Sequence, residues 1–223
     1  MVEFILMLTY NDATVENALD VYREVRGADL RYVGFKDIGL PFDRLKSLAD
    51  AIRADGRRVV LEVVSESRDD ELRSAHAGLD LGVDDLMGGT HVHDVVRITA
   101  GSPVRYFPFP GKVIGHPSLL RGTVPEIAES GRRLGATPGV HGLDLLAYRY
   151  DGDVETLVAS VVAAAGVPVV AAGSIGTEAQ IQRLAKLGVW GFTVGTAIFE
   201  RRFAAHDTSL KAQVDALLTI SRG

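Results

Sequence analysis

The sequence predicts an α/β fold in which eight parallel strands and their helices close into a single (β/α)8 TIM barrel. Short apolar runs alternate with amphipathic segments of helical period along the chain, which is the order of elements that builds a parallel sheet. Eight such units fit within 223 residues, and this length favours one closed barrel over an open sheet. No linker or change of composition interrupts the pattern, so a single domain over residues 1–223 is expected.

The expected strands are apolar runs without polar alternation, as in strands buried on both faces. They span residues 4–9, 32–36, 58–64, 83–87, 104–107, 141–146, 168–172 and 190–194. One connection breaks the rhythm, because residues 108–122 are long and rich in Pro and Gly. Loops of this length in compact domains are often functional. Its charged residues Lys112, His116 and Arg121 are typical of a lid over an anionic substrate, or of an exposed turn with incidental charges.

Two neighbouring strand ends near the C-terminus carry glycine beside a hydroxyl residue. The seventh expected strand runs into Gly173 and Ser174, and the eighth runs into Gly195 and Thr196. A phosphate must touch backbone N–H groups, and a β-carbon would hold it off. Tight turns alone would explain one such loop. Two of them, after the seventh and eighth strands of a barrel, predict that these four residues bind phosphate.

These two loops resemble those of the ribulose-phosphate-binding barrel superfamily, which includes phosphoribosylanthranilate isomerase and N-acetylmannosamine-6-phosphate epimerase. The resemblance covers nearly the whole chain in its pattern of units, but only the last two loops in motif. It implies the barrel and the phosphate site, and no specific member. Phosphoribosylanthranilate isomerase has a cysteine at the end of its first strand, where this chain has Thr9 and Tyr10. The epimerases show a glutamate before the seventh-strand glycine, where this chain has Ala172.

Composition excludes several classes of function. The formal net charge is −5 and no run of Lys and Arg exceeds two residues, so neither a nucleic-acid nor a membrane partner is expected. The chain has no cysteine, which excludes disulfides and thiolate metal sites. The N-terminus enters an apolar strand without a basic segment before it, so no signal peptide is visible and a cytoplasmic protein is expected. A homo-oligomer is compatible with the sequence.

Among the charged residues of the expected strands, three are candidates for chemistry, which a barrel places at the carboxyl ends of its strands. Lys36 ends the second strand, Glu62 lies near the end of the third, and Asp144 interrupts the apolar sixth. An unpaired charge there is costly, so a pair of Lys36 with Glu62 is expected, either structural or catalytic. Asp144 is expected to face the barrel interior. Further polar residues of the same face are Tyr10, Asn11, Asp12, Tyr148 and Arg149.

Two helix starts have a predicted cap. Thr177 followed three residues later by Gln180 fits a capping box, and Thr90 is a plausible cap of the helix that begins beside it. The spacing of His91 and His93 resembles a metal-binding pair. On a helix, however, residues two apart do not share a face, so no metal site is expected.

The sequence favours an enzyme that acts on a small phosphorylated sugar or sugar-derived carbonyl compound, as an isomerase or epimerase by proton transfer. Glu62 or Asp144 is then the base, Lys36 the electrophile, and the two glycine loops the phosphate anchor. One alternative is a Schiff-base aldolase or lyase with Lys36 as nucleophile. Another is a non-catalytic sensor of a phosphate-bearing ligand. No cofactor is expected.

Overall fold

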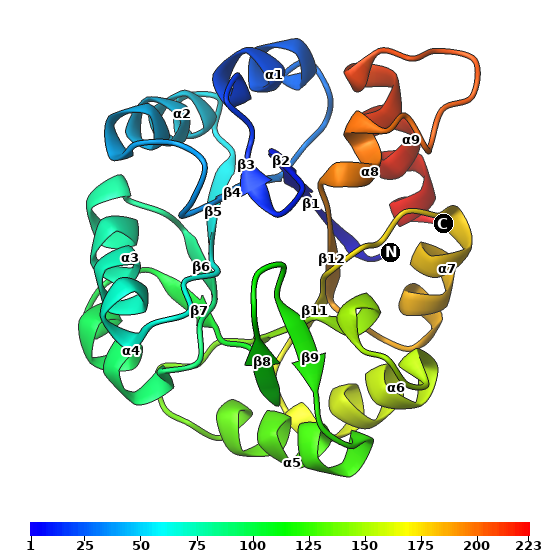
Figure 1. Cartoon of the computed structure of the whole chain (residues 1–223). Helices are drawn as coiled ribbons and strands as arrows, with labels where there is room; N and C mark the ends of the chain where they lie inside the picture. The colour runs from blue at the N-terminus through cyan, green and yellow to red at the C-terminus, as the bar shows by residue number, and fades with distance from the viewer.

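The computed structural model describes residues 1–223 and confirms the predicted TIM barrel (Figure 1). Eight strands form one parallel sheet in the order β10-β11-β12-β1-β4-β5-β6-β7. The strands are β1 (Glu3–Met7), β4 (Tyr32–Lys36), β5 (Arg58–Val63), β6 (Asp85–Gly88), β7 (Arg105–Phe107), β10 (Leu143–Leu145), β11 (Val169–Ala171) and β12 (Gly191–Val194). Strand β1 pairs with both β4 and β12, so the beginning and the end of the chain lie side by side in the sheet.

The remaining seam of the barrel lies between β7 and β10. His141 N donates to Tyr106 O at 2.8 Å, and Asp144 N donates to Pro108 O at 3.0 Å. These bonds join the two edges where no regular ladder forms, so the barrel is nearly closed. Because a closed sheet leaves few unpaired backbone groups, the short strands of this seam are tolerated.

The helices surround the sheet, as Figure 1 shows. They are α1 (Ala18–Val25), α2 (Phe42–Ala54), α3 (Arg68–Leu81), α4 (Val92–Thr99), α5 (Val124–Gly135), α6 (Val154–Ala165), α7 (Glu178–Lys186), α8 (Thr196–Phe199) and α9 (Leu210–Arg222), with a 3₁₀ turn η1 (Ala147–Arg149). The short helix α8 follows directly after Gly195 at the end of β12. None of the helices combines the length and the apolar character that crossing a membrane requires.

Two small hairpins stand in segments predicted as loops. The first pairs β2 (Thr9–Tyr10) with β3 (Ala13–Thr14), and the second pairs β8 (Lys112–Ile114) with β9 (Leu119–Arg121). The predicted single strand over residues 4–9 therefore ends earlier, at Met7. Strands of two or three residues are too short for alternation to register. In Figure 1 the β8–β9 hairpin reaches across the barrel opening.

The helix starts are partly as predicted. Thr177 and Gln180 form the expected capping box. Thr90 is not a cap, because α4 begins after His91. The buried carboxylate of Glu71 instead accepts from the main-chain N–H groups of Thr90 and His91, at 2.9 and 2.8 Å. A carboxylate from another helix therefore satisfies the first donors of α4, which no local pattern reveals.

Apolar side chains fill both sides of the sheet. The larger cluster packs the outer face of the strands against the helices. The smaller cluster fills the barrel interior, and its members are Ile5, Met7, Tyr32, Val60, Met87, Phe107 and Val170. The interior is therefore a packed core rather than a pore, and it supports the charged residues that stand above it.

We expect Gly142→Ala to destabilise the barrel seam. A β-carbon on Gly142 would overlap the ring of Phe107 and lie 2.8 Å from Pro168 O. Neither neighbour can move without disturbing the interior, so the free energy of unfolding should fall by about 1–3 kcal/mol in urea titrations. Gly27→Ala is the control, because its β-carbon meets only Lys211 Cε, at 3.6 Å. Equal stability of the two variants would contradict this view of the seam.

Candidate functional site

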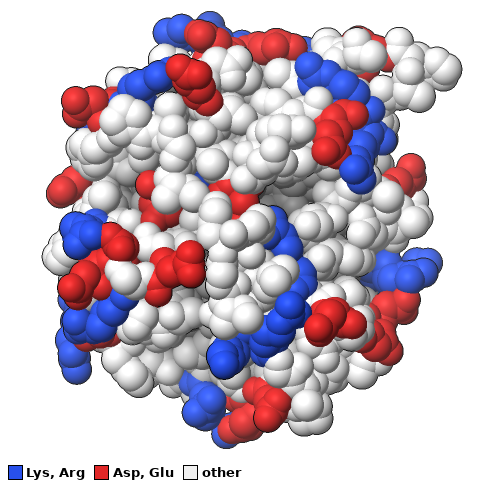
Figure 2. All heavy atoms as spheres, viewed as in Figure 1, with Lys and Arg blue, Asp and Glu red and all other residues white.

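A cavity opens at the carboxyl ends of the barrel strands, the face predicted to carry the chemistry. It has a volume of about 410 Å³. Its walls come from the ends of β1, β4, β5 and β12, from the loops after β10 and β11, and from the β8–β9 hairpin. Figure 2, viewed in the same direction as Figure 1, shows acidic and basic atoms around the hollow at the centre of this face.

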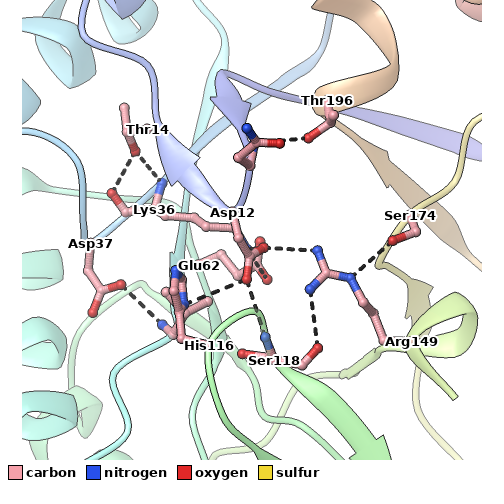
Figure 3. Close-up of polar contacts among 12 residues, drawn as sticks. Asp12, Thr14, Lys36, Asp37, Glu62, His116, Ser118, Arg149, Ser174 and Thr196 are labelled. Carbon is pink, nitrogen blue, oxygen red and sulfur yellow. Dashed lines mark hydrogen bonds and ion pairs between the residues drawn. The ribbon is translucent and has the colours of Figure 1, made fainter. Parts of the chain in front are cut away.

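Lys36 lies at the end of β4 with only 6% of its surface exposed. Its Nζ donates to Asp12 Oδ1 at 2.6 Å and to Glu62 Oε1 at 3.2 Å (Figure 3). The predicted partner Glu62 is confirmed, and the register of β4 and β5 sets the two residues opposite each other. Asp12 is the nearer partner. The sequence offers it only as one polar residue of its loop, because no spacing rule connects it with Lys36.

Opposing effects act on the pKa values of this ion pair. Burial by itself lowers the pKa of Lys36, but Glu62 and Asp12 outweigh burial, and the pKa is raised. Burial by itself raises the pKa of Asp12, but Lys36 and then Arg149 outweigh it and hold that pKa below its usual value. Ammonium and carboxylate are therefore both charged at neutral pH.

The β2–β3 hairpin places Asp12 through a second contact with β4. Lys36 N donates to Thr14 Oγ1 at 2.8 Å, and the same hydroxyl donates to Lys36 O at 2.9 Å. Thr14 N donates to Ile38 O at 3.0 Å. The hairpin is therefore anchored on both sides of Lys36, and its turn is held over the cavity.

The turn itself is strained in order to present the carboxylate. Asn11 and Asp12 both have left-handed backbones, with φ of 48° and 68°, as a two-residue hairpin turn of the favoured type requires. Glycine is the usual second residue of such a turn, and an L-residue there costs about 1–2 kcal/mol. The ionic contacts of the Asp12 side chain are what offsets this cost.

Asp144 lies on β10, two residues before Leu146, which lines the cavity. Its side chain is fully buried, and neither carboxyl oxygen has a hydrogen-bond partner. Burial raises its pKa well above the ordinary value, Glu62 raises it further, and Lys36 only partly opposes them. Burial therefore favours the neutral acid at Asp144, in keeping with the cost of burying a charge without a partner.

The predicted phosphate loops both face the cavity. Gly173, Ser174, Gly195 and Thr196 all line it. Gly173 and Ser174 have left-handed backbones, with φ of 81° and 56°, so this loop turns sharply after β11. Asn11 N donates to Thr196 Oγ1 at 3.2 Å, which leaves the hydroxyl hydrogen of Thr196 for another acceptor.

Glycine is also required in these loops by packing. A β-carbon on Gly195 would overlap Thr9 Oγ1, and one on Gly173 would overlap the Arg149 side chain. The sequence argument attributes both glycines to a bound phosphate, with a tight turn as the alternative for a single loop. The structure adds a second reason, the close approach of neighbouring protein atoms.

Two arginines flank the loop after β11. Arg149 Nε donates to Ser174 Oγ at 3.1 Å. Arg202 lines the cavity beside Gly176 and pairs with Glu200 at 2.7 Å. The sequence singles out Arg149 without a role and does not single out Arg202, which follows α8 in a turn without any periodic signal.

Other predicted candidates lie apart from the cavity or at its edge. His91 Nδ1 bonds to Glu71 Oε2 at 2.7 Å, and no group of three His, Asp or Glu side chains is arranged for a metal ion. Arg121 pairs with Asp151 at 3.0 Å on the surface, and Lys112 is exposed. His116 Nδ1 is 3.7 Å from the carboxylate of Asp12. Of these three residues of the predicted lid, only His116 approaches the site.

No known protein family matches the sequence, and no curated protein matches it. Solved structures do resemble the fold. A mandelate oxidase with (S)-mandelic acid superposes with a TM-score of 0.67 at 15% identity, over 98% of this chain and 71% of that one. A mandelate oxidase variant with an FMN adduct gives 0.64 at 16% identity, over 98% and 72%. A designed cube-shaped protein cage gives 0.68 at 15% identity, over 99% and 72%.

These similarities confirm the barrel and correct the expected function. The expectation of a sugar-phosphate isomerase or epimerase, with its lyase and sensor alternatives, is wrong, because the enzyme among these neighbours is an oxidase. The physical reason for the error is that glycine loops at the seventh and eighth strands anchor a phosphate without specifying the reaction beside it. At such low identity the neighbours show the fold alone.

We expect Asp144→Asn to change how stability depends on pH. The pKa of Asp144 is raised in the folded protein, so folding takes up a proton at pH values between the unfolded and the folded pKa. The contribution is favourable below the unfolded pKa of about 4 and is lost as pH rises toward the folded pKa. The asparagine variant lacks this loss. Its stability relative to the wild type should therefore rise as pH increases above about 4, as urea titrations can measure, and a pH-independent difference would refute the raised pKa.

We expect Lys36→Met to destabilise the protein by about 3–5 kcal/mol, because Glu62 would remain buried without a cation and Asp12 would keep only Arg149. Lys46→Met is the matched control. Lys46 pairs with Asp50 on an exposed helix face, where such a pair contributes at most about 0.5 kcal/mol. Chemical unfolding of both variants measures the difference. Similar losses would show that the pair at Lys36 does not hold the site together.

Proposed function

We propose that this chain is an enzyme that binds a small molecule bearing a phosphate group, with flavin mononucleotide as the first ligand to test. One observation carries the proposal: the ends of β11 and β12 present Gly173-Ser174 and Gly195-Thr196 to a single cavity. Main-chain N–H groups at these strand ends are a recurrent phosphate site in barrels. The resemblance to ribulose-phosphate-binding barrels supports the same anchor, but no reaction.

The donors around these loops suit a phosphate group. Arg149 and Arg202 add positive charge on the two sides of the loop after β11. The hydroxyl groups of Ser174 and Thr196 add two short donors, and both side chains line the cavity. Charge-assisted bonds of this kind are the strong ones in phosphate recognition.

The rest of the cavity suits a flavin ring in size and lining. Its volume of about 410 Å³ falls within the usual range for small-molecule sites. Apolar side chains of Met7, Leu146 and Ile175 line it together with Lys36 at the floor. Oxidases of the same fold are described with FMN adducts, which supports FMN over other phosphate esters. A flavin departs from the expectation of no cofactor, which rested on motifs alone.

The residues of this chain would divide the work as follows. A bound flavin would supply two-electron oxidation or reduction of an organic substrate. The glycine loops hold the phosphate, and the Lys36 ammonium has a third N–H beyond those given to Asp12 and Glu62. That N–H would stabilise negative charge on an oxygen or nitrogen atom above it. Beside Lys36, Glu62 would accept a proton from the substrate, and Asp144 would hold a proton deeper in the barrel.

We expect Ser174→Asp to weaken FMN binding by at least about tenfold, because a second negative charge would stand beside the phosphate. Ser174 is exposed and its backbone is left-handed, a conformation that Asp tolerates better than most residues. Gly195→Asp should abolish binding, but its side chain also overlaps Thr9. Quenching of flavin fluorescence on titration measures the affinity.

Thr177→Asp is the matched control for this charge. Thr177 caps α7 outside the cavity, and Asp is a good cap, so FMN should bind as to the wild type. If both Asp variants bind FMN equally well, the phosphate site is refuted. If the wild type binds inorganic phosphate but not FMN, the anchor stands and the flavin is refuted.

Homo-oligomer formation and cytoplasmic location stay predictions.

A further inference from the structure

One residue of the β8–β9 hairpin is held over the cavity by its main chain. Ser118 N donates to Asp12 Oδ2 at 3.3 Å, and Arg149 Nη1 donates to Ser118 O at 3.2 Å. Ser118 is only 4% exposed, although it lies between two surface strands. The hairpin does not pair with the barrel sheet. On the cavity side, its position therefore depends on this carboxylate and this guanidinium (Figure 3).

The same guanidinium reaches the predicted phosphate loop and the ion pair at the floor. Arg149 Nε donates to Ser174 Oγ at 3.1 Å, and Nη2 donates to Asp12 Oδ1 at 3.1 Å. Asp12 in turn holds Lys36. Arg149 thus contacts three separate structures with three of its five N–H groups, and two remain for a ligand. Its planar fork suits this bridging, which a lysine cannot reproduce.

We propose that Arg149 is a positioning residue that couples an anion at the phosphate loops to closure of the β8–β9 hairpin. This inference rests on the proposed function, since it requires an anion beside Ser174. Such an anion would accept from the free N–H groups of Arg149 and fix the plane of the guanidinium. In that orientation Nη1 and Nη2 hold Ser118 and Asp12. Occupation of the anchor therefore secures the hairpin over the cavity and excludes water from it.

Arg202 provides a matched comparison. It flanks the same loop from the side of Gly176 and lines the same cavity. Its carboxylate partner is Glu200, and it makes no bond to the hairpin or to Asp12. Loss of Arg202 should weaken anion binding without changing the hairpin. Loss of Arg149 should change both.

The test is amide hydrogen exchange of residues 112–121, measured by mass spectrometry with and without saturating inorganic phosphate. Wild type, Arg149→Lys and Arg202→Lys are compared, and calorimetry measures phosphate binding to each. In the free proteins, exchange of the hairpin should be about fivefold faster in Arg149→Lys than in the other two, as loss of one net hydrogen bond predicts. Phosphate should slow exchange in wild type and Arg202→Lys, but not in Arg149→Lys.

Two results overturn the coupling while leaving the anchor intact. One is hairpin exchange in free Arg149→Lys at the wild-type rate. The other is equal slowing by phosphate in Arg149→Lys and wild type, each shown by calorimetry to be saturated. Absence of phosphate binding to the wild type would refute the anchor and the coupling together. Calorimetry distinguishes that case, because it detects binding without reference to the hairpin.

Discussion

The site depends on the buried ion pair between Asp12 and Lys36, the shortest contact in its polar cluster at 2.6 Å. Two buried charges inside a barrel are stable only if each has a partner of opposite charge. Removing either one leaves the other buried, with a partner lost and no solvent to replace it. This requirement explains why a carboxylate residue, Asp12, stands at a left-handed turn position where glycine is usual. It also explains why the β2–β3 hairpin bonds through the hydroxyl group of Thr14 to the main-chain N–H and C=O of Lys36.

The sequence could predict whatever depends on periodicity or local chemistry. The eight barrel strands and the capping box at Thr177 follow from such signals, and the opposition of Lys36 and Glu62 follows from adjacent strands. The nearer partner, Asp12, could not be predicted, because its contact with Lys36 is set by how a hairpin folds back. The cap of α4 by Glu71 is hidden for the same reason. Contacts between segments that are distant in the chain produce no regular spacing of residues in the sequence from which they could be predicted.

The expected function was wrong for a related reason, because contacts that the sequence does not reveal also explain the two glycine loops. Glycine at two strand ends indicates that other atoms lie close to the backbone there. In this protein, some of these atoms belong to Thr9 and Arg149. A phosphate anchor is compatible with oxidases, isomerases and lyases alike, because it binds a part of the ligand that does not react. The reaction is decided several ångströms away, at Lys36 and its neighbours, where the donors and acceptors differ between barrels.

Charge balance then decides how such an anchor can work here. With Asp144 neutral, the cations Lys36 and Arg149 are matched by the carboxylates of Asp12 and Glu62, and Arg202 is matched by Glu200. No cation stands in excess for an incoming phosphate. Binding of the phosphate that we propose would therefore rest on main-chain N–H groups, on hydroxyls and on unused N–H groups of paired arginines. Hydrogen bonds from these donors are directional, so the proposed anchor depends on the geometry of the loops. The Arg149 guanidinium is important for this reason, because it bonds to both the loop and the hairpin.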